Sequence, residues 1–233
     1  MNQTSFSVTA ACKEIESKIS SIAQDSGRTP SEIRLIAVSK KQSVEKIQEA
    51  YSSGLRDFGE NYAQELKAKF EAISHPDIRW IFIGQLQSNK IKQIVTCASE
   101  IQALGNLRHA GMIEKFAKEQ NKCPYPVWIN VNCEQESSKG GVAPGEAEEL
   151  ARQIQRTLPG LKLMGIMAIP PKGYQDGPEN LEVPDIYLKL RKIADAVGEG
   201  RLSLGMSGDM GLAIKAGTDV IRIGSDLFGK RPG

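Results

Sequence analysis

The chain has 233 residues, and its 30 basic and 28 acidic side chains nearly balance, which leaves a net charge of +2. That balance argues against nucleic-acid binding through bulk charge. No apolar run approaches the roughly 18 residues of a membrane span, and the polar start of the chain has no signal-peptide core, so we expect no membrane association. The length suits a single domain over 1–233, since a strand–helix barrel typically takes about 250 residues.

Cysteine and histidine are scarce and scattered. The four cysteines form no Cys-x-x-Cys pair, and the chain has two histidines. In a chain of this length such cysteines indicate reduced thiols in a cytoplasmic protein. A zinc site rich in histidine or cysteine is not expected, and we predict no bound metal.

The apolar residues alternate between helical and strand patterns along the chain. Apolar spacings of three and four between Ser7 and Ala23 predict an amphipathic first helix. An apolar run predicts the first strand over 34–39, and the chain then alternates, with further strands predicted over 56–60, 79–83, 100–104, 126–132, 161–169, 201–205 and 219–223. The segments between them predict helices after Ser43 and over 61–73, 88–97, 106–121, 144–157, 184–197 and 208–216. A glycine-rich loop is expected over 137–141, and a long loop marked by proline and glycine over 170–178.

Eight strand–helix pairs after one additional helix predict an α/β protein. The architecture that fits is a single (β/α)₈ TIM-type barrel with an extra N-terminal helix. The alternative is an open, doubly wound sheet. That sheet would need a topological switch point, and no G-x-G-x-x-G motif follows the first strand.

The first predicted strand runs directly into two lysines, Lys40 and Lys41. A continuous apolar run predicts a strand that is buried on both faces, and α/β proteins place their chemistry at the carboxyl ends of such strands. Alternation along the strand predicts that the two lysines point to opposite faces, so that only one enters the mouth of the barrel. We expect Lys40 to hold a carbonyl cofactor there, although a lone lysine is more often simply solvated.

Glycine and serine follow the last two predicted strands. Met206, Ser207 and Asp209 lie after the seventh strand, and Arg222-Ile-Gly224-Ser225 ends the eighth. In barrel enzymes the loops after these strands commonly bind phosphate, helped by the amino end of a helix. The simpler alternative is that Ser207 and Asp209 only cap a helix.

A phosphate at that position would face Lys40 across the mouth of the barrel, because closure brings the eighth strand beside the first. An amine and a phosphate site at opposite ends of one small ligand favour pyridoxal 5′-phosphate held as a Schiff base. A phosphate-binding barrel enzyme without pyridoxal, in which Lys40 is an electrostatic clamp, is a further alternative.

Six motifs, in order along nearly the whole chain, carry a resemblance to a known family. They are Ala37-Val-Ser-Lys40, Phe58-Gly-Glu-Asn-Tyr62-x-Gln-Glu65, Phe82-Ile-Gly-x-Leu-Gln-x-Asn-Lys90, Gly165-x-Met-Ala-Ile-Pro170, Gly205-Met-Ser-x-Asp209 and Val220-x-Arg-Ile-Gly-Ser225-x-x-Phe-Gly229. With them the chain resembles the pyridoxal phosphate homeostasis proteins (the YggS-like family), which are relatives of the barrel domain of alanine racemase.

The resemblance implies a fold type III pyridoxal-phosphate protein in which Lys40 forms the Schiff base. It implies that Ser207, Gly224 and Ser225 hold the phosphate, and that Arg222 faces the pyridine nitrogen. Asn61 and Met206 complete the expected cofactor-binding set.

The function implied is to maintain or supply pyridoxal phosphate in vitamin B6 homeostasis, without strong catalysis. The recipients would be apo-enzymes, and we expect a monomer. An arginine at the ring nitrogen, charged up to about pH 12, makes the ring a weak electron sink. The chain also ends soon after the eighth strand, which leaves no length for the second domain of alanine racemase. A racemase-like enzyme acting on amino acids is the alternative.

Two departures from the family pattern concern the surroundings of the pocket. Ile81 stands where the family usually has a histidine, and Gly105-Asn-Leu-Arg108 replaces a commoner acidic-and-arginine ending of the fourth strand. They bear on side contacts of the pocket rather than on the cofactor.

Overall fold

A computed structural model describes residues 6–134, 140–171, 173–176 and 182–229. Its strands are β1 (Arg34–Val38), β2 (Asp57–Glu60), β3 (Arg79–Phe82), β4 (Glu100–Leu104), β5 (Tyr125–Asn132), β6 (Leu161–Ile169), β7 (Arg201–Ser203) and β8 (Val220–Ile223). Its α-helices are α1 (Val8–Asp25), α2 (Val44–Ser52), α3 (Ala63–Ala72), α4 (Ile91–Cys97), α5 (Leu107–Glu119), α6 (Ala147–Thr157), α7 (Asp185–Asp195), α8 (Met210–Lys215) and α9 (Ser225–Phe228).

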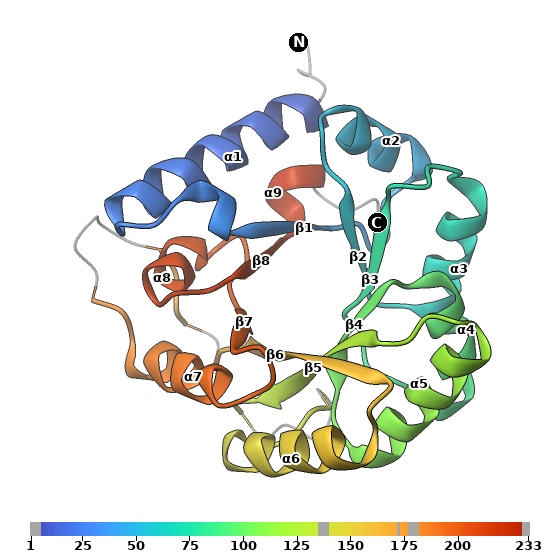
Figure 1. Ribbon diagram of the computed structural model, residues 1–233. Coiled ribbons are helices and arrows are strands. Elements are labelled where there is room, and N and C mark those ends of the chain that lie inside the picture. Colours follow the sequence, from blue (N-terminus) through green and yellow to red (C-terminus); the bar gives the residue numbers. More distant parts are fainter. Residues whose placement is uncertain (1–5, 135–139, 172, 177–181, 230–233) are drawn as a thin grey trace.

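The strands form one closed barrel in sequence order, and the helices surround it as an outer ring (Figure 1). Closure is made by parallel pairing of β1 with β8, from Arg34 opposite Val220 to Ala37 opposite Ile223. The predicted (β/α)₈ barrel is therefore confirmed, and the open doubly wound sheet is excluded. Parts of the two predicted loops, 137–139, 172 and 177–178, lie outside the described residues.

Several boundaries differ from the predicted ones. The helix expected over 88–97 begins as a 3₁₀ turn, η2 (Ser88–Lys90), before α4, and the helix expected over 144–157 begins as η4 (Pro144–Glu146) before α6. The short helix α9 was not predicted, because four residues are too few to show helical periodicity. The first strand ends at Val38, one residue earlier than expected, and this matters for the site.

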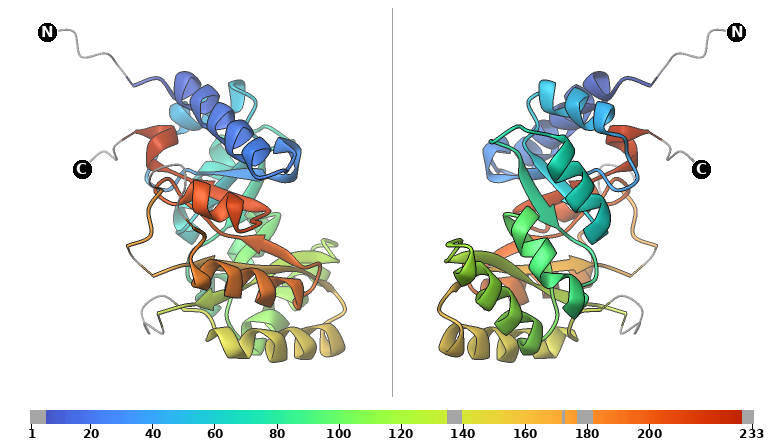
Figure 2. Two further views of the ribbon diagram at one scale, coloured as in Figure 1. Left: turned by 90° about the vertical axis from the view of Figure 1, so that its left-hand side faces the viewer. Right: turned by 90° about the vertical axis from the view of Figure 1, so that its right-hand side faces the viewer.

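The extra helix α1 lies in the outer ring between α2 and α8, and it packs on α9 (Figure 1). Its buried residues are Val8, Ala11, Cys12, Ile15, Ile19 and Ala23, which follow the predicted spacing. Figure 2 shows α8, α7 and α6 following one another along the flank below α1. Among the residues that the structure describes, no helix is both long and apolar enough to cross a membrane.

The interior of the barrel is partly apolar and partly a chain of hydrogen bonds. From the amino ends of the strands upward, Arg34 donates to Glu100 at 2.7 Å, and Glu100 accepts from Gln102 at 2.7 Å. Ser203 donates to Gln102 at 2.8 Å and accepts from Arg222 at 2.6 Å. Because buried polar groups are costly unless paired, this chain allows an arginine to stand deep inside the barrel.

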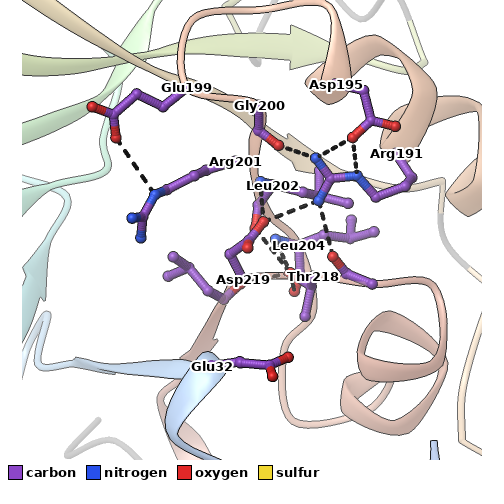
Figure 3. Close-up of polar contacts among 12 residues, drawn as sticks. Glu32, Arg191, Asp195, Glu199, Gly200, Arg201, Leu202, Leu204, Thr218 and Asp219 are labelled. Carbon is purple, nitrogen blue, oxygen red and sulfur yellow. Dashed lines mark hydrogen bonds and ion pairs between the residues drawn. The ribbon is translucent and has the colours of Figure 1, made fainter. Parts of the chain in front are cut away.

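A second polar cluster ties the short strand β7 to β8 at their amino ends (Figure 3). The Asp219 carboxylate accepts from the Leu202 amide at 2.7 Å and from Arg191 at 3.0 Å. The Thr218 hydroxyl accepts from the Leu204 amide at 3.0 Å and donates to nearby carbonyl oxygens. These contacts extend the pairing of a strand that has only three residues, and they fix the start of the loop that follows β7.

Candidate functional site

A cavity of about 210 Å³ opens at the carboxyl ends of the strands. All of the residues predicted to bind the cofactor line it: Lys40, Asn61, Met206, Ser207, Arg222, Gly224 and Ser225. The remaining lining residues are Val38, Ile83, Met167, Ile169 and Gly208. Segments that are far apart in the sequence thus converge on one site, as the carboxyl-end rule for barrels predicts.

Lys40 lies in a tight turn rather than on a strand. Because β1 ends at Val38, side-chain alternation does not govern Lys40 and Lys41, and that part of the sequence argument was wrong. The Gln42 amide donates to the Ser39 carbonyl at 3.0 Å and closes the turn, and Lys41 takes a φ of 58°. Lys40 lines the cavity, whereas Lys41 is exposed and outside the lining set. The turn, not the pleat, therefore separates the two lysines.

The loop after β7 is shaped by Asp209. One carboxylate oxygen of Asp209 accepts from the Met206 amide at 2.7 Å, and the other accepts from the Tyr187 hydroxyl at 2.6 Å. Asp209 stands at the N-cap position of α8, but its side chain makes no capping hydrogen bond. The amides of α8 are instead capped by Asp176, whose carboxylate accepts from Gly211 and Leu212. The alternative that Asp209 serves only as a helix cap is therefore wrong, and Ser207 faces the cavity.

Arg222 forms the floor of the cavity and is 4% exposed. Its guanidinium donates to the Ser203 hydroxyl at 2.6 Å and to the Ala168 carbonyl at 2.8 Å. Burial lowers the pKa of Arg222 to about 10, against the opposing attraction of Asp209. The side chain therefore remains a cation at neutral pH, as expected from the sequence.

Asn61 stands between this cavity and a larger one of about 520 Å³. Its buried side-chain oxygen has no hydrogen-bond partner among the residues that the structure describes. The two cavities share Asn61, Ile83, Met167 and Ile169, so they adjoin one another. The larger cavity is lined by a different lysine, Lys90, and contains neither Lys40 nor the two serines.

The apolar lining residues were not singled out from the sequence. Ile83 and Met167 lie inside two of the six family motifs, but an isoleucine or methionine in a buried run does not by itself indicate a ligand contact. Gly208 lies between two residues that were noted, Ser207 and Asp209. Val38 and Ile169 are the last residues of their strands, and strand-end positions were the signal that could have found them.

The two departures from the family pattern lie away from the cavity lining. Ile81 is fully buried inside the barrel, among Ile36, Trp128 and other apolar side chains. Asn106 caps α5 by accepting from the His109 amide at 2.8 Å, and with Gly105 it lines a separate cavity of about 190 Å³. Within the described ranges, no group of three or more histidine, cysteine or acidic side chains is placed to hold a metal.

Comparison with known proteins gives a family and a set of relatives. Residues 12–232 match the family described as alanine racemase, N-terminal domain. The pyridoxal phosphate homeostasis protein of Aquifex aeolicus is 36% identical over 95% of this chain and 98% of its own length. That of Vibrio alginolyticus is 39% identical over 94% of this chain and 95% of its own.

Solved structures show the same architecture. PipY of Synechococcus elongatus, determined without pyridoxal phosphate (PLP), superimposes with a TM-score of 0.80 at 29% identity, over 95% of this chain and all of that chain. PipY with PLP bound gives a TM-score of 0.79 at 27% identity, with the same coverage. Alanine racemase of Bartonella henselae shares the fold, with a TM-score of 0.69 at 14% identity over 97% of this chain and 61% of that one.

Proposed function

We propose, because the chain belongs to the family of pyridoxal phosphate homeostasis proteins, that it binds pyridoxal 5′-phosphate in the 210 Å³ cavity and maintains or supplies this cofactor. The observation that carries the proposal is the convergence of an amine, two serine hydroxyls and a buried guanidinium on one cavity at the carboxyl ends of the strands. A phosphorylated pyridine aldehyde matches this donor set in charge and in hydrogen-bonding capacity.

Lys40 is the residue that we propose to hold the cofactor covalently. The cofactor supplies an aldehyde, which condenses with a primary amine to a Schiff base and releases one water molecule. Lys40 is the lysine that lines the cavity among its described residues, and it follows β1, the strand that pairs with β8. Its part is to present an amine at one end of the site while the phosphate is held at the other.

The phosphate is proposed to lie against the loops after β7 and β8. Ser207 and Ser225 offer hydroxyl donors there, and Gly224 keeps the backbone free of a side chain. Met206 adds apolar lining beside them. The Asp209 carboxylate accepts the Met206 amide and so fixes the loop, while its own charge is engaged by the Tyr187 hydroxyl.

Arg222 favours a binding role over an enzymatic one. We place the ring nitrogen against its guanidinium, which remains charged at neutral pH and therefore does not transfer a proton to that nitrogen. A ring without that proton withdraws fewer electrons than one paired with a carboxylate, so it activates an amino acid poorly. A racemase-like enzyme is the second candidate, supported by the family model and by the Asn61 oxygen, which offers a polar contact to a further ligand.

Three further parts of the proposal concern the cellular setting. We propose that PLP-dependent apo-enzymes receive the cofactor, since the cavity opens at the barrel surface. We propose a cytoplasmic location, which fits Cys12, Cys97 and Cys123, three cysteines of the described residues that form no disulfide. We also propose that the chain works as a monomer.

Equilibrium titration with pyridoxal phosphate tests the site. The double variant Ser207→Ala/Ser225→Ala is expected to bind more weakly by about tenfold or more per lost contact, because hydrogen bonds to charged groups contribute about 1.5–3 kcal/mol. Ser17→Ala, at an exposed position of α1, is the matched control and should bind as the unmodified protein does. Equal affinity in the double variant would remove these serines from the site.

Solvent deuterium exchange at the α-carbon of a panel of amino acids separates the two candidate functions. A carrier protein is expected to give no exchange at enzymatic rates, which lie in the range of about 1–10³ per second. Exchange at such rates, lost in Lys40→Ala, would replace the carrier function with the racemase-like one.

A further inference from the structure

The turn that presents Lys40 is unusual in its backbone. Lys41 has a φ of 58°, in the left-handed region that residues with a side chain seldom adopt. The turn also follows immediately on the carboxyl end of β1, where the last ladder contact is the Ser39 amide donating to the Gly59 carbonyl at 3.0 Å. Contacts from outside the turn must therefore hold it in this form.

Those contacts come from β2 and α3. The Lys69 ammonium donates to the Ser39 carbonyl at 2.7 Å, and the Lys41 amide donates to a Glu65 carboxylate oxygen at 2.7 Å. The two residues that flank Lys40 are thus both held by hydrogen bonds, Ser39 through its carbonyl and Lys41 through its amide. Lys40 lies between these two residues in the chain and lines the cavity.

The side chains that hold the turn, Glu60, Glu65 and Lys69, form one ionic cluster. Lys69 lies 2.7 Å from one oxygen of Glu60 and 3.2 Å from Glu65, and the Ser39 hydroxyl donates to the same oxygen of Glu60. The side chain of Lys69 is 8% exposed and that of Glu60 is fully buried. Lysine is almost never fully buried unless it is paired, and Lys69 on the inner face of α3 is paired with both carboxylates.

Burial of the Glu60 carboxylate is energetically unfavourable. The second carboxylate oxygen of Glu60 is buried and has no hydrogen-bond partner within the described part of the chain. Burial raises the pKa of Glu60 despite the nearby ammonium of Lys69. Replacing an ion pair of this kind by apolar side chains commonly leaves stability unchanged or improved. An ionic cluster that adds little to the stability of the fold is better explained by its orientation of the adjacent 39–42 turn.

We propose that Glu60, Glu65 and Lys69 are positioning residues for Lys40: they hold the 39–42 turn in the one geometry that directs the Lys40 amine into the cavity. This inference rests on the proposed function, in which Lys40 makes the covalent linkage. It adds that a second set of residues, outside the cavity lining, governs how readily that linkage forms.

The test compares two ligands. Pyridoxal 5′-phosphate can use both Lys40 and the phosphate contacts, whereas 4-deoxypyridoxine 5′-phosphate has the same ring and phosphate but no aldehyde. Lys69→Met and Glu65→Ala should weaken binding of the aldehyde by about tenfold, the effect of one lost charged hydrogen bond, and change affinity for the deoxy analogue by less than about twofold. A general disturbance of the fold would weaken both ligands alike, and that result would overturn the inference.

Matched variants sharpen the comparison. Lys67 lies on the exposed side of α3, in a 3.6 Å ion pair with Glu71. The Lys67→Met substitution should leave the affinities for both ligands unchanged. Glu65→Gln keeps an oxygen that can accept from the Lys41 amide, so it should bind the aldehyde nearly as the unmodified protein does. Glu65 is 30% exposed in its side chain, so the glutamine and alanine variants remain informative if Lys69→Met fails to fold.

A readout without any cofactor completes the test. Hydrogen exchange of the Lys41 amide should be faster in Glu65→Ala than in the unmodified protein, and unchanged in Lys67→Met. If the unmodified protein forms no adduct at Lys40, the proposed function itself fails. If it forms the adduct, and Glu65→Ala and Lys69→Met form it equally well with an unchanged Lys41 amide, the positioning role alone is overturned.

Discussion

The guanidinium of Arg222 donates a 2.6 Å hydrogen bond to the hydroxyl of Ser203 inside the barrel. Ser203 in turn donates to Gln102 at 2.8 Å. A serine outside the cavity lining therefore supports the guanidinium at the floor of the cavity. Ser203→Ala would leave a buried charged donor with one partner fewer. We expect the free energy of unfolding to fall by about 1–3 kcal/mol, measured by urea denaturation.

Ser31→Ala, at an exposed position, is the control for the Ser203 substitution and should change stability by less than about 0.5 kcal/mol. Equal stability of the Ser203→Ala protein and the unmodified protein would mean that the hydrogen-bond chain through the barrel contributes nothing to folding.

Asp57 at the amino end of β2 should govern part of the acid sensitivity. It accepts from Arg34 at 2.8 Å and from Arg79 at 2.6 Å. Burial by itself would raise the pKa of Asp57, but the two arginines outweigh it and hold the pKa below its usual value of 3.8. Asp57→Asn should cost stability near the lower end of the about 3–5 kcal/mol seen for a broken buried pair, since Arg79 is largely exposed.

The sign of the pH dependence follows from the lowered pKa of Asp57. The unfolded chain binds a proton at this carboxylate more readily than the folded chain does, so its contribution is complete above pH 3.8 and is lost as the pH falls through the folded pKa. The difference in unfolding free energy between the unmodified protein and Asp57→Asn should therefore shrink below pH 3.8. A difference that stayed constant or grew would contradict the ion-pair account.

Two glycines should respond in opposite directions to alanine. A Cβ at Gly84 would lie 1.9 Å from the Asn61 carbonyl oxygen, so Gly84→Ala must displace the segment that carries Asn61. For Gly84→Ala we expect lower stability and weaker binding of pyridoxal phosphate.

A Cβ at Gly111, within α5, meets nothing within 4 Å, and Gly111→Ala should stabilise the protein by about 0.5–1 kcal/mol. Thermal denaturation of both proteins decides it, and a stable Gly84→Ala protein with normal binding would contradict the close approach.

The barrel could be predicted from the sequence because short strand segments, most of them apolar, alternate with helical segments along the chain. The strands β2 and β7 are not apolar runs, and they were predicted from their places in this alternation. The choice of Lys40 rested on strand-end position and on family resemblance, and it selected a residue of the cavity lining. The expectation that strand alternation separates Lys40 from Lys41 failed, since the chain leaves the strand at Val38 and turns. A one-residue difference in a strand end is below what periodicity resolves.

The supporting contacts could not be predicted from the sequence. Lys69 looks like any lysine of an amphipathic helix until α3 is docked, and only then does it lie against Glu60 and Ser39. The chain from Arg34 to Arg222 likewise depends on the register of four strands, β1, β4, β7 and β8. Pair contacts between distant segments need the tertiary fold, which local patterns do not contain.

The most direct test of the central claim is mass spectrometry of the protein after incubation with pyridoxal phosphate and reduction with borohydride. We predict one reduced pyridoxyl phosphate group, on the peptide that contains Lys40, in the unmodified protein and in Lys41→Ala, and none in Lys40→Ala. An adduct on Lys41 or on another lysine, with Lys40 unmodified, or no adduct at all under conditions where the protein is folded, would contradict the account.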